Sequence, residues 1–150
     1  MKAATPLVLI DIDRAKPAAT DWSIPAPSYL PGACNIGPEE IARRRTAAVA
    51  GLLATTGFAA VLLVTGAPDA LRLLVAVPAA VTAIAALQVR NRFCVAYAAQ
   101  GVYNVAGKAG EITQVADHDA LRRDRLRAAR MSLAGAAAGL AAALLLVLIP

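Results

Sequence analysis

Three long apolar stretches alternate with segments that are rich in charged residues and proline. The stretches cover residues 46–64, 71–88 and 131–149, and Arg72 is the only charged residue inside them. A helix rises about 1.5 Å per residue, so each stretch is long enough to cross the roughly 30 Å hydrocarbon core of a bilayer. The pattern predicts an all-α integral membrane protein with three transmembrane helices.

A tight turn joins the first two apolar stretches. Gly66 and Pro68 occupy this turn, and Pro78 is expected to kink the second helix because proline removes a backbone hydrogen bond. Arg72, near the start of the second helix, is expected to extend its charge toward the membrane surface. We interpret residues 43–106 as a two-helix membrane hairpin followed by an interfacial segment.

The interfacial segment, residues 93–106, is apolar but too short to cross a bilayer. It is expected either to lie flat at the membrane surface or to re-enter the bilayer shallowly. Tyr97 and Tyr103 would then lie at the level of the lipid headgroups, where aromatic side chains with a polar group are favoured.

Residues 107–150 are predicted to form a basic amphipathic helix that continues into the third transmembrane helix. Asp117 or Asp119 is the expected N-cap of this helix, because a carboxylate there accepts hydrogen bonds from unpaired backbone N–H groups. Gly135 and Gly139 form a G-x-x-x-G pattern within the apolar part. Such a pattern lets two helix backbones approach closely and predicts helix packing at these glycines.

Residues 1–42 show little periodicity and are rich in proline, which favours an extended arm on the cytoplasmic side. Trp22 and Tyr29 are large apolar anchors within it and the expected contacts to a partner. The arm is either a disordered tail or a segment that lies along a partner or the membrane surface, since linkers rarely carry so many large apolar residues. Its prolines are Pro6, Pro17, Pro25, Pro27, Pro31 and Pro38.

Composition supports the membrane interpretation and argues against nucleic-acid binding. The chain is 59% hydrophobic and 17% charged, whereas soluble domains are about 45–50% apolar and about 25% charged. The net charge is +5. The basic residues flank the apolar stretches and are not accompanied by a stacking aromatic motif, so membrane orientation explains them better than nucleic acid does.

The distribution of basic residues predicts the orientation. Six precede the first helix and eight lie between the second and third, whereas the turn between the first two offers only Asp69 and Arg72. Lys and Arg accumulate in cytoplasmic loops, so we predict a bacterial inner-membrane protein with its N terminus in the cytoplasm and its C terminus outside. The expected anchors at the cytoplasmic membrane surface are Arg43, Arg44, Arg45, Arg90, Arg92, Tyr97 and Tyr103.

Two short motifs flank the hairpin. The first has the form N-x-G-x-x-[DE]-x-x-x-R, and the second follows the second helix. Their residues are Asn35, Gly37, Glu40 and Arg44 before the hairpin and Cys94, Tyr97 and Gly101 after it. Over residues 34–105 the chain thereby resembles the YgaP-like inner-membrane family, a two-helix domain of unknown biochemical role that is sometimes fused to a rhodanese sulfurtransferase domain. Val95 stands where the family has proline after the cysteine.

Cys34 and Cys94 are the only cysteines. A cytoplasmic position would keep both thiols reduced, so no structural disulfide is expected. Arg90 and Arg92 are close to Cys94 in the sequence, and nearby cations favour a thiolate. A sulfur-transfer or redox module at the membrane surface is therefore the alternative to two structural cysteines in apolar surroundings.

The remaining polar residues do not converge on a catalytic, metal or cofactor site. His118 is the only histidine, and adjacent positions on a helix point in different directions, so Asp117 and Asp119 cannot complete a metal site with it. The glycines of residues 101–110 lack the spacing of a phosphate-binding loop. No cofactor and no enzymatic activity are predicted.

The sequence therefore favours a non-catalytic accessory or scaffold subunit of a larger bacterial inner-membrane complex, such as a respiratory or photosynthetic one. Helices of small residues suit close helix packing, and an extended arm suits contact with a partner. The expected partners are the lipid bilayer and other membrane subunits. A second copy of the chain, joined through Gly135 and Gly139, is a further expectation.

Overall fold

Three long helical segments and a small, mostly non-helical lobe make up the fold. The computed structural model describes residues 28–105, 108 and 110–149, so the predicted anchor Trp22 lies outside the described residues. In chain order the elements are α1 (Pro38–Val64), α2 (Asp69–Arg72), the 3₁₀ turn η2 (Leu73–Val75), α3 (Ala76–Asn91), α4 (Val95–Gln100), β1 (Val102–Tyr103), β2 (Thr113–Gln114) and α5 (His118–Val147).

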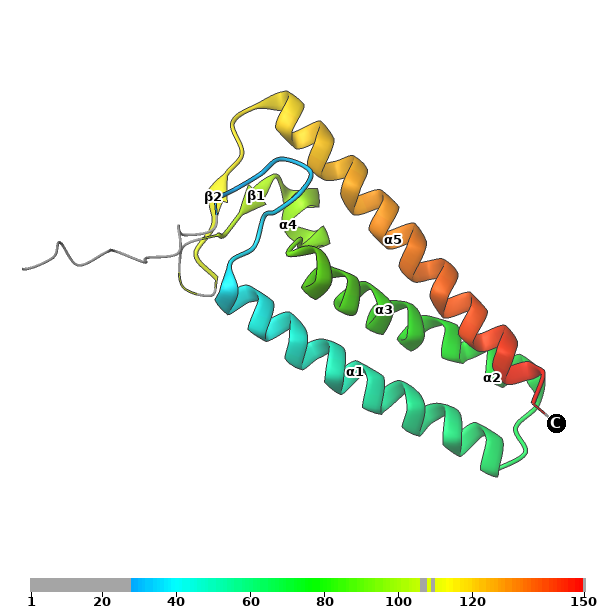
Figure 1. Cartoon of the computed structure of the whole chain (residues 1–150). Coiled ribbons are helices and arrows are strands. Elements are labelled where there is room, and N and C mark those ends of the chain that lie inside the picture. Colours follow the sequence, from blue (N-terminus) through cyan, green and yellow to red (C-terminus); the bar gives the residue numbers. More distant parts are fainter. Residues whose placement is uncertain (1–27, 106–107, 109, 150) are drawn as a thin grey trace, which may run out of the picture.

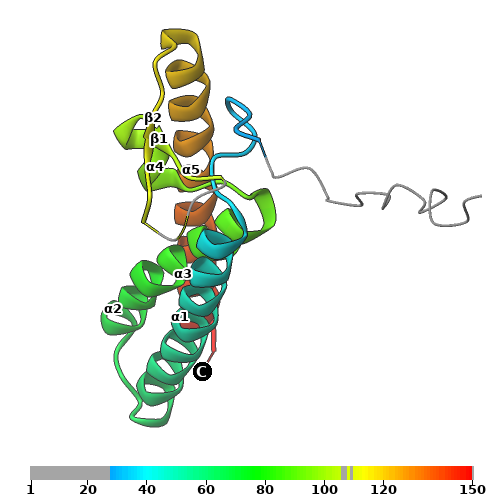
Figure 2. The same ribbon diagram turned by 90° about the vertical axis from the view of Figure 1, so that its left-hand side faces the viewer.

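The long helices form a layered bundle with α3 in the middle, packed against α1 on one side and α5 on the other (Figure 1). The short elements α4, β1 and β2 gather at the end where α1 and α5 begin, and there β1 pairs antiparallel with β2 (Figure 2). We call this end the polar lobe. It comprises residues 28–37, 92–105 and 110–117 together with the first two turns of α1 and of α5.

Three helical segments are long and apolar enough to cross a membrane, in agreement with the predicted spans: Pro38–Val64, Asp69–Asn91 and His118–Val147. The third is one unbroken helix, which confirms that the basic segment continues into the third apolar stretch. Asp117 is its N-cap, and the carboxylate accepts hydrogen bonds from the backbone N–H groups of the second and third residues of the helix. The all-α prediction is therefore confirmed, apart from one two-stranded ribbon.

The helical part of the first segment is longer than predicted. Pro38 lies in the first turn of α1, where a proline costs no intrahelical hydrogen bond. The helix then continues through the arginine triplet without interruption to Val64. The helix therefore begins at Pro38, before the predicted boundary of the arm at residue 42.

The second segment changes helix type before Pro78. Residues Leu73–Val75 form a 3₁₀ turn between the α-helical residues on either side. Pro78 lacks the N–H that would bond to the carbonyl of Leu74 in an α-helix, and Leu74 lies inside the 3₁₀ turn. The proline effect predicted as a kink thus takes the form of a local tightening of the preceding turn.

Arg72 bonds to backbone carbonyls at the end of the bundle where α1 and α5 end, and its extension toward a membrane surface stays a prediction. Its side chain is buried, and Nε donates to the carbonyl of Ala67 at 2.9 Å. Nη1 donates to the carbonyl of Ile149 at 2.5 Å. The guanidinium therefore joins the turn after α1 to the residues that follow the end of α5.

Gly135 and Gly139 lie buried where α5 crosses α3. A Cβ at Gly135 would overlap the side chain of Ile84, and a Cβ at Gly139 would overlap the carbonyl of Ala76 and the atoms of Ala80. The close helix approach predicted from the G-x-x-x-G pattern is therefore present within one chain. A second copy could reach these glycines only by displacing α3.

Candidate functional site

Asn35 joins the segment before α1 to the segment after α3 within the polar lobe. Its side chain is 0% exposed, and its amide nitrogen donates to the carbonyl of Cys94 at 3.0 Å. The amide oxygen accepts the backbone N–H of Cys94 at 2.6 Å. Two residues later, a Cβ at Gly37 would overlap the carbonyl of Val105. The asparagine and the glycine of the first motif thus allow two backbones to lie in contact.

Glu40 is the centre of a buried polar network, and its side chain is 1% exposed. Oε1 accepts the hydroxyl of Tyr97 at 3.0 Å and the backbone N–H of Gly110 at 2.9 Å. Arg43 Nη1 lies 3.3 Å from Oε1, and Arg44 Nη2 lies 3.3 Å from Oε2. One carboxylate therefore connects α1, α4 and the loop before β2, which a buried charge requires in order to be stable.

Arg44 links this carboxylate to a buried thiol. Its Nη2 donates to Sγ of Cys94 at 3.2 Å, and its guanidinium carbon lies 5.8 Å from the centroid of the Tyr97 ring. Cys94 is 1% exposed, so a soluble reagent reaches the sulfur only when the lobe opens. Cys34 is half-buried, and both cysteines are free thiols.

The predicted membrane anchors fall into two groups. Arg44, Tyr97 and Tyr103 are half-buried and make contacts within the lobe. The sequence placed two later arginines beside the thiol of Cys94, whereas the cation in contact with the sulfur belongs to α1. The exposed members of the set are Arg43, Arg45, Arg90 and Arg92.

Asp124 holds the end of the N-terminal arm on α5. It is 0% exposed, and its carboxylate accepts the hydroxyl of Tyr29 at 2.9 Å and the backbone N–H of Gly32 at 2.5 Å. The ring of Tyr29 also stacks on that of Tyr103, with centroids 4.3 Å apart. Tyr29, predicted to contact a partner, therefore contacts the body of its own chain.

These contacts predict a loss of stability in alkali. Burial and the hydrogen bond to Asp124 raise the pKa of Tyr29 above its ordinary value of 10.0, and burial and the bond to Glu40 raise the pKa of Tyr97. The unfolded tyrosines release their protons first, so the stabilisation is complete below pH 10 and falls as the pH rises further. We expect the unfolding free energy in mild detergent to decrease between pH 9 and pH 11.

Tyr29→Phe provides the control for this pH dependence. The variant lacks the hydroxyl, so it should be less stable than the parent at pH 9 and should approach it at pH 11. Equal pH dependence of the parent and the variant would show that Tyr29 does not contribute.

An apolar groove of about 660 Å³ runs along α1, α3 and α5 outside the lobe. Thr55 of α1 and Thr82 of α3 meet within it, with their hydroxyl oxygens 3.2 Å apart. Arg45 and Arg90 line the end of the groove that lies next to the lobe. The groove is otherwise lined mainly by small side chains, namely Ala48, Ala59, Ala79, Ala83, Ala86, Ala138 and Ala142.

In the sequence, Glu40 stood out only as a member of the first motif, and nothing was assigned to Asp124. A signal for Asp124 was present, because it is the only acidic residue in the stretch 122–130, which holds five arginines. An isolated carboxylate among cations on an amphipathic helix indicates a specific partner. No comparable signal marked Glu40, since its neighbour Glu39 has the same charge.

Comparison of the chain with protein-family models, with curated proteins and with solved structures gives no match. The resemblance to the YgaP-like family therefore stays a prediction. The motif residues on which it depends do have a common physical role. Asn35 and Arg44 both bond to Cys94, and Glu40 bonds to Tyr97, three residues further along the chain.

Proposed function

We propose that this protein is a non-catalytic scaffold subunit of a larger bacterial inner-membrane complex. Its apolar groove receives one transmembrane helix of a partner subunit, and the polar lobe fixes the ends of the groove helices relative to one another. The observation that carries this proposal is the groove itself, because small side chains let a partner's helix backbone approach closely.

Membrane placement is supported by the exposure of large apolar side chains along the three helices. Leu53 is 68% exposed, Val64 88% and Leu133 71%. Such continuous apolar surface is stable in lipid and unfavourable in water. The basic residues near the lobe favour a cytoplasmic position for this end of the bundle.

Charge selects the kind of helix that would occupy the groove. Arg45 and Arg90 stand at the lobe end, beside a groove that is otherwise apolar except for Thr55, Thr56 and Thr82. The proposed partner helix therefore carries an acidic side chain at its cytoplasmic end, where it can pair with the two guanidinium groups. Along the rest of its length this helix presents small and apolar residues, which fit against alanine.

Photocrosslinking from within the groove tests this proposal. A benzophenone amino acid at Ala86, which lines the groove, should form an adduct with one transmembrane segment when cells that carry the native complex are irradiated. Ala138→Leu narrows the groove and should reduce that adduct at least tenfold. Ala137→Leu is the matched control, since this exposed neighbour does not line the groove.

Adducts with lipid alone would overturn the proposal, as would an adduct that Ala138→Leu leaves unchanged. The adduct should be identified by its peptide sequence, because an acidic residue at the cytoplasmic end of the captured segment is part of the expected result. A segment without one would contradict the charge argument.

A further inference from the structure

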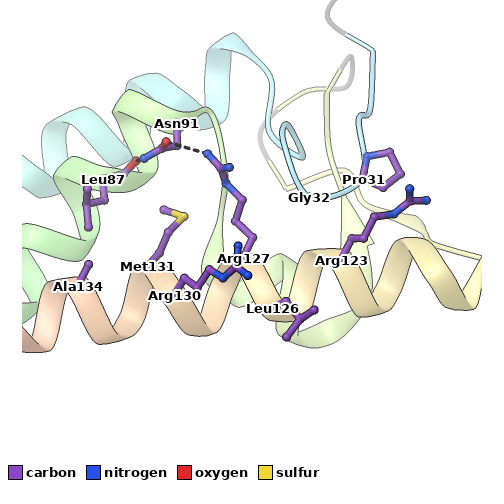
Figure 3. A pocket seen from close by; sticks show the side chains of 10 residues that line it. All are labelled: Pro31, Gly32, Leu87, Asn91, Arg123, Leu126, Arg127, Arg130, Met131 and Ala134. Atoms are coloured by element: carbon purple, nitrogen blue, oxygen red, sulfur yellow. Dashed lines mark hydrogen bonds between the residues drawn. The ribbon is translucent and has the colours of Figure 1, made fainter.

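A second cavity lies between the arm and the adjoining ends of α3 and α5 (Figure 3). Its volume is about 440 Å³, and three of its ten lining residues are arginines, whereas none is acidic. The arginines Arg123, Arg127 and Arg130 all belong to α5. Their spacing of three and four residues places them on one face of this helix.

Arg127 extends across the cavity from α5 to the end of α3 (Figure 3). Its Nη2 donates to Oδ1 of Asn91 at 2.8 Å, and Asn91 in turn donates to the carbonyl of Leu87 at 2.7 Å. Its guanidinium carbon lies 5.8 Å from the centroid of the Phe93 ring. Within the described part of the chain its buried Nε has no acceptor. The guanidinium is therefore held in position with a donor still unused.

The acidic side chains of this region are engaged elsewhere. Asp124 accepts hydrogen bonds from Tyr29 and Gly32, on the arm side of α5. Asp117 caps the helix and lies 3.9 Å from the exposed Arg123. The positive charge of Arg127 and Arg130 is thus left available to an anion in the cavity.

Polarity changes from one end of the cavity to the other. The end beside the arm has Arg123 and Pro31, whereas the other end has Leu87, Met131 and Ala134 (Figure 3). The latter three residues lie within the apolar stretches 71–88 and 131–149. A ligand that fills the cavity therefore combines an anionic group with an apolar chain.

We propose that this cavity binds the phosphate of an anionic phospholipid, and that one acyl chain of the lipid lies along Leu87 and Ala134. The inference rests on the membrane placement stated under the proposed function, but not on the occupant of the groove. Arg127 and Arg130 bind the phosphate, because guanidinium groups match its oxygens in both charge and geometry. The apolar end selects a lipid over a soluble phosphate.

Lipid titration of the full chain in mild detergent, followed by native mass spectrometry, tests this site. The probes are dioleoyl phosphatidylglycerol and, as an uncharged comparison, dioleoyl phosphatidylcholine. We expect the parent to bind phosphatidylglycerol at least tenfold more tightly. Arg127→Gln combined with Arg130→Gln should remove that preference, and Arg130→Gln alone should weaken it several-fold without removing the hydrogen bond to Asn91.

Arg122→Gln combined with Arg125→Gln is the matched control, with the same charge change on the same helix but outside the cavity. It should keep the preference to within about twofold of the parent, since surface attraction alone is not specific to a site. Equal binding of the two lipids, or an equal loss in this control, would overturn the site. Competition by glycerol phosphate at the concentration of the lipid would assign a soluble ligand and overturn the lipid. Loss of the lipid preference would leave the expected crosslink in the groove unaffected, so each proposal can be refuted without the other.

Discussion

Replacement of Glu40 by alanine is expected to open the polar lobe. The carboxylate is 1% exposed and accepts hydrogen bonds from Tyr97 and Gly110, besides its ion pairs with Arg43 and Arg44. Its loss leaves donors buried without a partner, at a cost of about 3 kcal/mol in unfolding free energy. For a chain of this size that corresponds to a fall in Tm of roughly 10 °C.

Thermal unfolding in mild detergent measures this effect, and Glu39→Ala serves as its matched control. Glu39 lies in the same first turn and has the same charge, but its side chain is exposed. We expect its replacement to change the Tm by no more than a few degrees. In the Glu40→Ala variant, the opened lobe should also expose the thiol of Cys94, which would then react with a maleimide. Equal Tm values for the two variants would contradict the role assigned to Glu40.

Gly139→Ala should weaken the contact between α5 and α3. The new Cβ would overlap the carbonyl of Ala76 and both the backbone and the side chain of Ala80. Backbone atoms cannot rotate away as a long side chain can, so the helices must separate, at a cost of about 3 kcal/mol. Gly135→Ala should also destabilise this contact, because its Cβ would overlap Cγ1 of Ile84, a β-branched side chain that is stiff at χ1.

Gly57→Ala is the control for this prediction. This glycine is also inside a long helix, but no atom lies within 4 Å of the position that its Cβ would take. Alanine there should leave the stability unchanged or raise it by up to about 1 kcal/mol, because alanine favours helix. If both substitutions had the same effect on chemical unfolding in detergent, the close packing of α3 and α5 would not be important for stability.

The long helices could be predicted from the sequence because their signals are local. Apolar length marks the three segments, and Asp117 marks the start of α5. The G-x-x-x-G pattern also identified a close helix contact correctly. It could not identify which helix makes that contact, since the pattern is the same for a neighbour in the chain and for a second copy.

The polar lobe could not be predicted in the same way. Asn35 and Cys94 are 59 residues apart, and Tyr29 and Asp124 are 95 apart, yet each pair is joined by hydrogen bonds. In the sequence, Asn35 and Glu40 stand out only as members of the first motif, and membership in a motif does not by itself require burial. Burial of a carboxylate depends on the donors that other segments bring to it, and no local pattern records these.

The buried guanidinium of Arg72 makes the bundle dependent on the order in which its parts are made. The hairpin of α1 to α3 leaves the ribosome first, at a time when the carbonyl of Ile149 does not yet exist. Until α5 has packed in place, the Nη1 of this arginine must keep water around it, because an unpaired buried charge is costly. Packing of α5 against α3 therefore completes the hairpin as well as the bundle, because it supplies the acceptor that the guanidinium of Arg72 needs.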